Sequence, residues 1–259
     1  MRIVLPPSET KRPGGHMNSR MDWASLVLPE LTSTRQQIAS DLVALSASSG
    51  AGKALGLGAK GAEWLEANHE LLSSPVMPAI ERYTGVVFDA LGYASMNEGA
   101  RQRVAECMWL FSALFGPILA TDLIPRYRLS FDSKLPGESL KSRWGVHAEA
   151  MWAHDFTLDL RSEGYRALAP LTPGSGVFVR VVKDLGGGAT AGHANKATKG
   201  TFVRAIVDSG ARFNSGDDVL GWADDHGFER RHEPTLRVSS CLRLSTSSRR
   251  QRGFATAPD

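Results

Sequence analysis

Polar side chains are most densely clustered between His193 and Gly200, in a segment whose pattern predicts a helix over 194–207. On such a helix Lys196, Lys199 and Arg204 share one face, with the small residue Gly200 between them. Three cations on one face suit contacts to phosphates, because each supplies a charge-assisted hydrogen bond. A charge run is most often a solvated helix face, but solvated faces usually carry acidic partners at i,i+4, which we expect these cations to lack.

A second helix is expected at 217–224, after a turn at 209–211. Together with the cationic helix it suggests a helix–hairpin–helix unit, which binds the DNA backbone through hairpin amides without reading the base sequence. Asp217 and Asp218 lie close to the hairpin and weaken this interpretation.

Another polar cluster follows the strand expected at 156–160, where Ser162, Glu163 and Tyr165 open a short helix. The first amides of a helix attract anions, so these side chains could orient a ligand. The simpler alternative is that Ser162 caps the helix while Tyr165 packs inward, and the sequence favours it.

Three further motifs do not meet the requirements of the sites they resemble. Gly56–Gly61 spells GxGxxG but follows a helical, Ser/Gly-rich stretch rather than a strand. Gly50–Ala54 resembles the end of a P-loop, but Ala54 stands where a P-loop needs Ser or Thr. His147, Glu149 and His154 have no further ligand at zinc-site spacing. We therefore predict no metal site and no cofactor.

The composition is that of a soluble globular protein: 259 residues, 42% hydrophobic and 22% charged. The net charge is +3, of which residues 245–259 carry +2 (three arginines against Asp259), leaving about +1 for the rest. That small charge allows a polyanionic partner only through a local patch. No apolar run is long enough to span a membrane, and the first residues do not resemble a signal peptide, so we expect a cytoplasmic protein without membrane contact.

The expected elements alternate too irregularly for a doubly wound sheet. Strands are predicted at 2–5, 108–115, 156–160, 177–182 and 235–244, and helices at 34–46, 61–72, 78–91, 97–105, 139–153, 194–207 and 217–224. We predict an α+β fold with a mixed β-sheet wrapped by helices. It forms a single compact domain over 1–244, followed by a disordered basic tail at 245–259.

Motifs along nearly the whole chain resemble the YaaA family of peroxide-stress proteins. They are, in order, Leu5-Pro6-Pro7-Ser8-Glu9-Thr10-Lys11, Glu81-Arg82-Tyr83-Thr84-Gly85-Val86, Leu114-Phe115-Gly116, Pro125-Arg126-Tyr127-Arg128-Leu129, Ser133-Lys134-Leu135-Pro136-Gly137, Trp144, Asp159-Leu160-Arg161-Ser162, Tyr165 and Asn195-Lys196-Ala197-Thr198-Lys199-Gly200.

The resemblance implies an α+β domain with a helix–hairpin–helix element and a positively charged cleft. It also implies a cytoplasmic protein that binds DNA and limits damage from peroxide and unincorporated iron. Carried over to this sequence, the cleft candidates are Lys11, Tyr83, Tyr127, Arg128, Lys134, Ser162, Tyr165, Asn195, Lys196, Lys199 and Arg204.

Two functions of different classes follow. In the first, Lys196, Lys199 and Arg204, with Asn195, Lys134, Arg128 and Tyr127, hold double-stranded DNA by its phosphates. In the second, an enzyme of lyase or glycosyl-transfer type acts on a phosphorylated, nucleoside-like small molecule. Its catalytic candidates are Glu9, Lys11, Tyr83, Ser162, Glu163 and Tyr165. The second requires Glu9, Lys11, Tyr83, Ser162 and Lys196 to converge in one pocket.

Overall fold

The computed structural model describes residues 1–58, 61–182, 189–230 and 241–246, and its centre is a seven-stranded sheet in the order β4-β3-β1-β6-β7-β9-β8. The five inner strands run parallel, and the two edge strands, β4 and β8, are antiparallel to their neighbours. A separate pair is formed by β2 and β5. The strands are β1 Arg2–Leu5, β2 Met77–Pro78, β3 Met108–Ser112, β4 Gly116–Leu119, β5 Leu123–Ile124, β6 Thr157–Asp159, β7 Gly176–Val182, β8 Phe228–Arg230 and β9 Cys241–Thr246. The predicted mixed sheet with helices is confirmed.

Strand β1 lies in the middle of the sheet, between β3 and β6. Its residues Ile3, Val4 and Leu5 are fully buried, because a central parallel strand has helices on both faces. An uninterrupted apolar run is therefore what this position requires.

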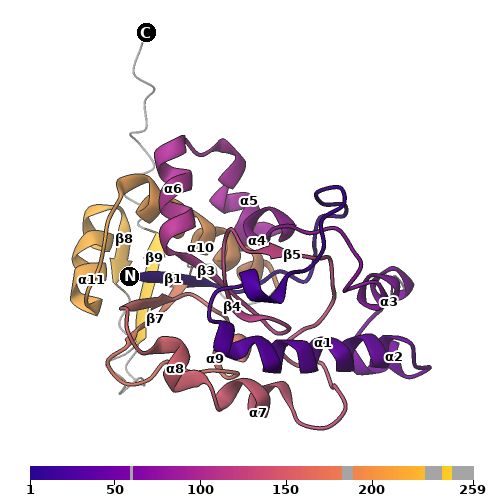
Figure 1. Ribbon diagram of the computed structural model, residues 1–259. Helices are drawn as coiled ribbons and strands as arrows, with labels where there is room; N and C mark the ends of the chain where they lie inside the picture. Colours follow the sequence, from indigo (N-terminus) through magenta and orange to yellow (C-terminus); the bar gives the residue numbers. More distant parts are fainter. Residues whose placement is uncertain (59–60, 183–188, 231–240, 247–259) are drawn as a thin grey trace.

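Helices cover both faces of the sheet (Figure 1). Helices α5, α6 and α10 lie on one side, and α1, α7 and α8 lie on the other. The helices are α1 Thr32–Ser46, α2 Ala51–Ala54, α3 Gly61–His69, α4 Ala79–Arg82, α5 Val86–Leu91, α6 Glu98–Cys107, α7 Leu140–Gly145, α8 Ala148–Trp152, α9 Glu163–Arg166, α10 Ala189–Ser209 and α11 Gly216–Asp225, with short 3-10 turns at Trp23–Ser25, Pro29–Leu31 and Tyr93–Ser95. None of the described helices is long and apolar enough to cross a bilayer.

Two predicted helices are each split in two. The helix expected at 78–91 breaks after α4, where Tyr83 is extended and Gly85 has φ +102°, a conformation that favours glycine. The helix expected at 139–153 divides into α7 and α8. The first break matters for the site, because it turns Tyr83 toward Lys11, with which it forms an isolated antiparallel bridge.

The strand expected at 108–115 ends earlier than predicted, and Gly116 and Pro117 after it do not end the sheet. Residues Gly116–Leu119 return as β4, with Pro117 opposite Phe111. Proline fits there because β4 is an edge strand, whose outer side has no partner.

The helix–hairpin–helix prediction is not confirmed. Helices α10 and α11 do follow one another, but the hairpin amides between them are already bonded: Ala211 donates to Ser209 Oγ, and Asn214 and Ser215 donate to the Asp218 carboxylate. These amides are therefore not offered to phosphates. Strand β9 runs to Thr246, two residues into the predicted tail. The glycine run 186–188 and residues 247–259 lie outside the described residues.

Candidate functional site at the carboxyl edge of the sheet

The predicted site residues gather where the parallel strands end. Ser112 closes β3, the segment from Ser8 to Lys11 follows β1, and Ser162 follows β6. Because β1 lies between β3 and β6 and runs parallel to both, these three chain segments meet at one edge. Ligands of sheets with parallel strands bind at this carboxyl edge.

Lys11 is buried among aromatic rings. Its Nζ lies 4.2 Å from the centre of the Tyr127 ring and 5.2 Å from that of Tyr83. The ammonium donates to the carbonyl oxygens of Ser8 (2.8 Å) and Glu9 (3.3 Å). Burial, and next the positive charge of Arg128, hold the pKa of Lys11 well below its ordinary value. A lysine in this state readily gives up its proton.

A chain of hydroxyls runs beside Lys11. Tyr83 and Tyr127 share a hydrogen bond of 2.6 Å, and Tyr127 shares another of 2.6 Å with Ser112. The Ser112 oxygen also accepts from the amides of Leu114 and Phe115, so its own proton is directed to Tyr127. Burial raises the pKa of both tyrosines, which keeps them neutral proton donors. Sequence reasoning missed Ser112, although its place at the end of a predicted strand is a usable signal.

Glu9 and Arg128 form an ion pair at the surface above this chain. The Arg128 guanidinium donates to the Glu9 carboxylate at 2.8 Å, and the Glu9 side chain is 64% exposed. Tyr165 is buried nearby against Phe131, and burial, then the neighbouring Tyr127, raises its pKa. Tyr165 therefore packs inward, as the simpler interpretation of its segment predicted.

A buried ion pair holds the turn after β6. Arg161 donates to both oxygens of the Asp159 carboxylate (2.9 and 2.8 Å), and both side chains are fully buried. The guanidinium also donates to the carbonyl of Ala169 at 2.9 Å. It lies against the rings of both Phe111 and Trp152, 4.6 and 4.7 Å from their centres. The pair thus fixes the backbone that carries Ser162, Glu163 and Tyr165.

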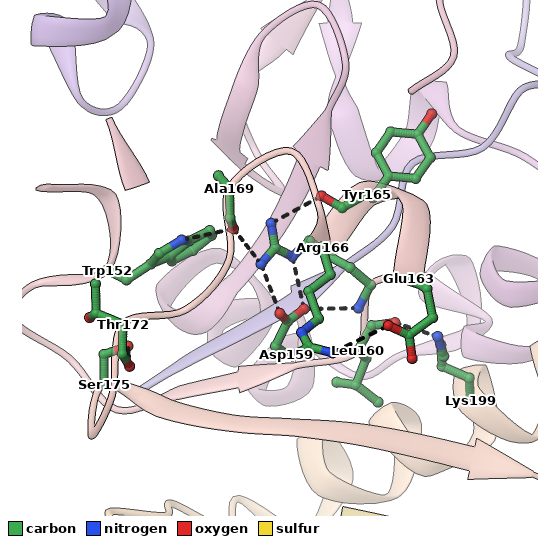
Figure 2. A network of polar contacts seen from close by, with 11 residues as sticks. Trp152, Asp159, Leu160, Glu163, Tyr165, Arg166, Ala169, Thr172, Ser175 and Lys199 are labelled. Atoms are coloured by element: carbon green, nitrogen blue, oxygen red, sulfur yellow. Dashed lines mark hydrogen bonds and ion pairs between the residues drawn. The ribbon is translucent and has the colours of Figure 1, made fainter. Parts of the chain in front are cut away.

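A pocket of about 200 Å³ lies beyond this turn. Its lining includes Ser162, Glu163, Arg180, Asn195, Lys196 and Lys199. Lys196 and Ser162 are exposed, and Ser162 does not cap α9 with its side chain. Figure 2 shows Lys199 directed at the Leu160 carbonyl, to which it donates. Burial lowers the pKa of Lys199 to about 8 against the raising effect of Asp159 and Glu163. Glu163 itself is paired with Arg166 (3.2 Å) and Arg180.

The three cations predicted on one face of α10 are not equally accessible. Helix α5 covers that face: a Cβ added to Gly200 would lie 2.3 Å from the Val87 carbonyl oxygen. Arg204 donates to the carbonyls of Leu91 and Gly92 at the end of α5. It also has the acidic i,i+4 partner that we expected to be missing, Asp208, at 2.7 Å. Of the three predicted cations, only Lys196 is exposed.

The remaining candidates divide among separate pockets. Glu9 and Arg128 line one pocket, while Ser162 and Lys196 line another. Lys134 lies in a third, with Lys53. The enzyme hypothesis required Glu9, Lys11, Tyr83, Ser162 and Lys196 in one pocket, but Glu9, Tyr83 and the Ser162–Lys196 pair line three different pockets. They nevertheless share one edge of the sheet.

The described residues contain no group of three or more His, Cys, Asp or Glu side chains placed to hold a metal ion. His147, one of the histidines considered above, instead shares a hydrogen bond of 2.8 Å with Thr34.

Comparison with known proteins places the chain in a family. The family model described as "Peroxide stress protein YaaA" matches residues 1–233. A UPF0246 protein of Corynebacterium glutamicum is 40% identical over 249 residues, which cover 93% of this chain and 99% of the relative. A UPF0246 protein of Streptomyces coelicolor is 34% identical over 241 residues, covering 88% and 91%. The chain therefore belongs to the YaaA (UPF0246) family of peroxide stress proteins.

Proposed function

We propose that this peroxide stress protein acts in the cytoplasm by binding double-stranded DNA through its phosphates, and that it limits iron-dependent damage there. The contact is made at the carboxyl edge of the sheet, by the pocket of Lys196 and Lys199, rather than by a helix–hairpin–helix unit. Arg128 and Lys134 would extend the contact along that edge. Tyr127, also predicted to contact phosphates, is fully buried and takes no part in it.

One observation carries this proposal: Lys196 lies exposed beside a polar pocket that also contains Asn195, Ser162 and the Lys199 ammonium. Amide, hydroxyl and ammonium groups are the usual partners of phosphate oxygens, and they carry no base readout. Family membership supports the link to peroxide stress.

The test is DNA binding by fluorescence anisotropy over a salt series. Each lost phosphate contact lowers the slope of log affinity against log salt by about 0.9, so Lys196→Gln should show that reduction. Lys141→Gln is the matched control, because Lys141 is an exposed lysine on α7 outside the pockets described here. No binding at about 50 mM salt, or an unchanged slope for Lys196→Gln, would refute the proposal.

A second candidate is an enzyme that acts on a phosphorylated, nucleoside-like molecule with the Lys11–tyrosine cluster alone, because Ser162 and Lys196 lie in a separate pocket. A buried lysine of lowered pKa beside the Tyr83–Tyr127–Ser112 chain can take up and deliver protons. DNA-backbone binding has no need of such a chain.

This candidate is tested by incubating the protein with nucleoside 5′-monophosphates and following release of the free base by chromatography. Lys11→Met and Tyr83→Phe should abolish turnover while leaving DNA affinity unchanged. Turnover that survives in Lys11→Met would exclude Lys11 from the chemistry, and no turnover by the wild type would remove the candidate.

A further inference from the structure

Positive charge exceeds negative charge around Lys11. Arg82, Arg126 and Arg128 all act on the Lys11 ammonium by electrostatic repulsion, and Glu9 is the carboxylate that opposes them. Arg126 is paired with Glu63 and Arg128 with Glu9. Arg82 is fully buried and donates only to backbone carbonyls, as does Lys11. Three arginines face two carboxylates among these described residues, and Lys11 adds a fourth cation when it is protonated, so the excess is one or two positive charges.

Two of these arginines also have nitrogens without an acceptor. Arg128 Nη1 and Arg126 Nε are buried and have no hydrogen-bond partner. Leaving a buried charged donor unpaired is costly, and an arginine fork normally engages two oxygens of one anion. Both observations indicate that this cluster is completed by an acceptor from outside the chain.

A pocket of about 340 Å³ lies beside Arg128. It is lined also by Glu9, Trp64, Gly56 and Gly58. A Cβ added to Gly56 or Gly58 would meet nothing within 4 Å, so this wall of the pocket leaves open space. Trp64 contributes an aromatic wall, with the Arg126 guanidinium 4.3 Å from its ring centre. The pocket therefore combines a cation with a surface suited to a flat organic group.

We propose that this pocket binds a phosphate monoester, with Arg128 holding the phosphate and Trp64 lying against the organic group that carries it. A monoester carries between one and a half and two negative charges at neutral pH, against one for a phosphodiester. Its larger charge also favours the protonated form of Lys11, which brings the local excess to two and matches the monoester. The phosphate would replace Glu9 on Arg128. Glu9 is largely exposed, and an exposed ion pair contributes about 1 kcal/mol or less, so its side chain can turn to solvent at little cost.

This inference goes beyond the DNA contact at Lys196 and does not depend on it. The same chemistry could come from a free nucleotide or from the 5′-phosphate at a strand end. The segment of Gly56 and Gly58 has no preceding strand, so the sequence excluded it as a phosphate cradle. In this proposal its glycines leave room for the ligand and do not bind it through their amides.

Isothermal titration with adenosine 5′-monophosphate, inorganic phosphate and adenosine tests the proposal. We expect the monophosphate to bind more tightly than phosphate, and adenosine to give no measurable heat. Arg128→Gln should weaken the monophosphate roughly 10–100-fold, because it removes a charged hydrogen-bond donor. Glu9→Gln should tighten it several-fold, because it removes the carboxylate that competes for Arg128. Arg20→Gln is the control for Arg128→Gln: it removes the same charge from an exposed residue, on the segment after β1 that also carries Glu9.

The opposite effects of the two variants keep the proposal refutable even if Arg128→Gln fails to fold, because Glu9 is exposed. An affinity that falls in Glu9→Gln overturns it, and so does a wild type that binds neither the two phosphate compounds nor a 5′-phosphorylated strand. An oligonucleotide bearing a 5′-phosphate is compared with the same strand bearing a 5′-hydroxyl. A preference for the phosphorylated strand without nucleotide binding assigns the site to strand ends. Lys196→Gln should lose DNA affinity and keep nucleotide affinity, so the two proposals fail separately.

Discussion

Replacing Arg161 by methionine should remove a large part of the stability of the fold. The change leaves the Asp159 carboxylate fully buried and without its cation, while the backbone amide of Arg161 still donates to it at 3.0 Å. Removing one partner of a buried pair costs about 3–5 kcal/mol, against a total free energy of unfolding of about 5–15 kcal/mol. The acceptor carbonyl of Ala169 also loses a donor.

The assay is urea unfolding followed by circular dichroism for Arg161→Met, Asp159→Asn and the double variant. If the cost comes from an uncompensated charge, the double variant should lose less than the sum of the single losses, with a coupling of about 0.5–3 kcal/mol. A loss below about 1 kcal/mol in Arg161→Met, or strictly additive losses, would refute the account of how the turn after β6 is held.

Two further results are expected. Gly200→Ala should destabilise the protein by about 1–3 kcal/mol, because its Cβ would lie 2.3 Å from the Val87 carbonyl oxygen. In Gly221→Ala, on α11, the added Cβ meets nothing within 4 Å, so this variant should be more stable than the wild type by about 0.5–1 kcal/mol. Equal effects in thermal unfolding would contradict the close packing of α10 on α5. Lys199 has a folded pKa of about 8 against an ordinary 10.5, so folding disfavours its charged form at and below pH 8, and this cost disappears as the pH rises toward 10.5. The free energy of unfolding of the wild type, measured relative to that of Lys199→Met, should therefore rise by on the order of 2 kcal/mol between about pH 8 and 10. If this difference between the two proteins does not change with pH, Lys199 is not buried as described.

Much of the sheet could be predicted from sequence, because its strands are apolar runs bounded by turn residues. Ile3, Val4 and Leu5 are one example, since a central parallel strand requires an unbroken apolar segment. Strand β4 was missed, because the proline and glycine that usually end a strand are tolerated at a sheet edge.

The site was predictable only in part. The family resemblance named Lys11, Tyr83, Tyr127 and Tyr165, and the parallel strand ends bring these residues to one edge. The role of α10 could not be derived from its own pattern, because whether a face is solvated or covered depends on α5, which lies about a hundred residues earlier. The partial burial of Arg204 follows from that packing, and that of Lys199 from its contact with the Leu160 carbonyl, not from their spacing.

The central place of β1 has a consequence for synthesis. Its partners β3 and β6 leave the ribosome roughly a hundred and a hundred and fifty residues later, which at about 5–20 residues per second takes on the order of 5–30 s. Throughout that interval β1 lacks the strands with which it pairs in the folded sheet, and its apolar residues are left without those partners. Strand β1 can therefore pair within the sheet only once β3 has been made, about a hundred residues after β1 itself. A chaperone that binds short apolar segments would find its target in β1 during that interval.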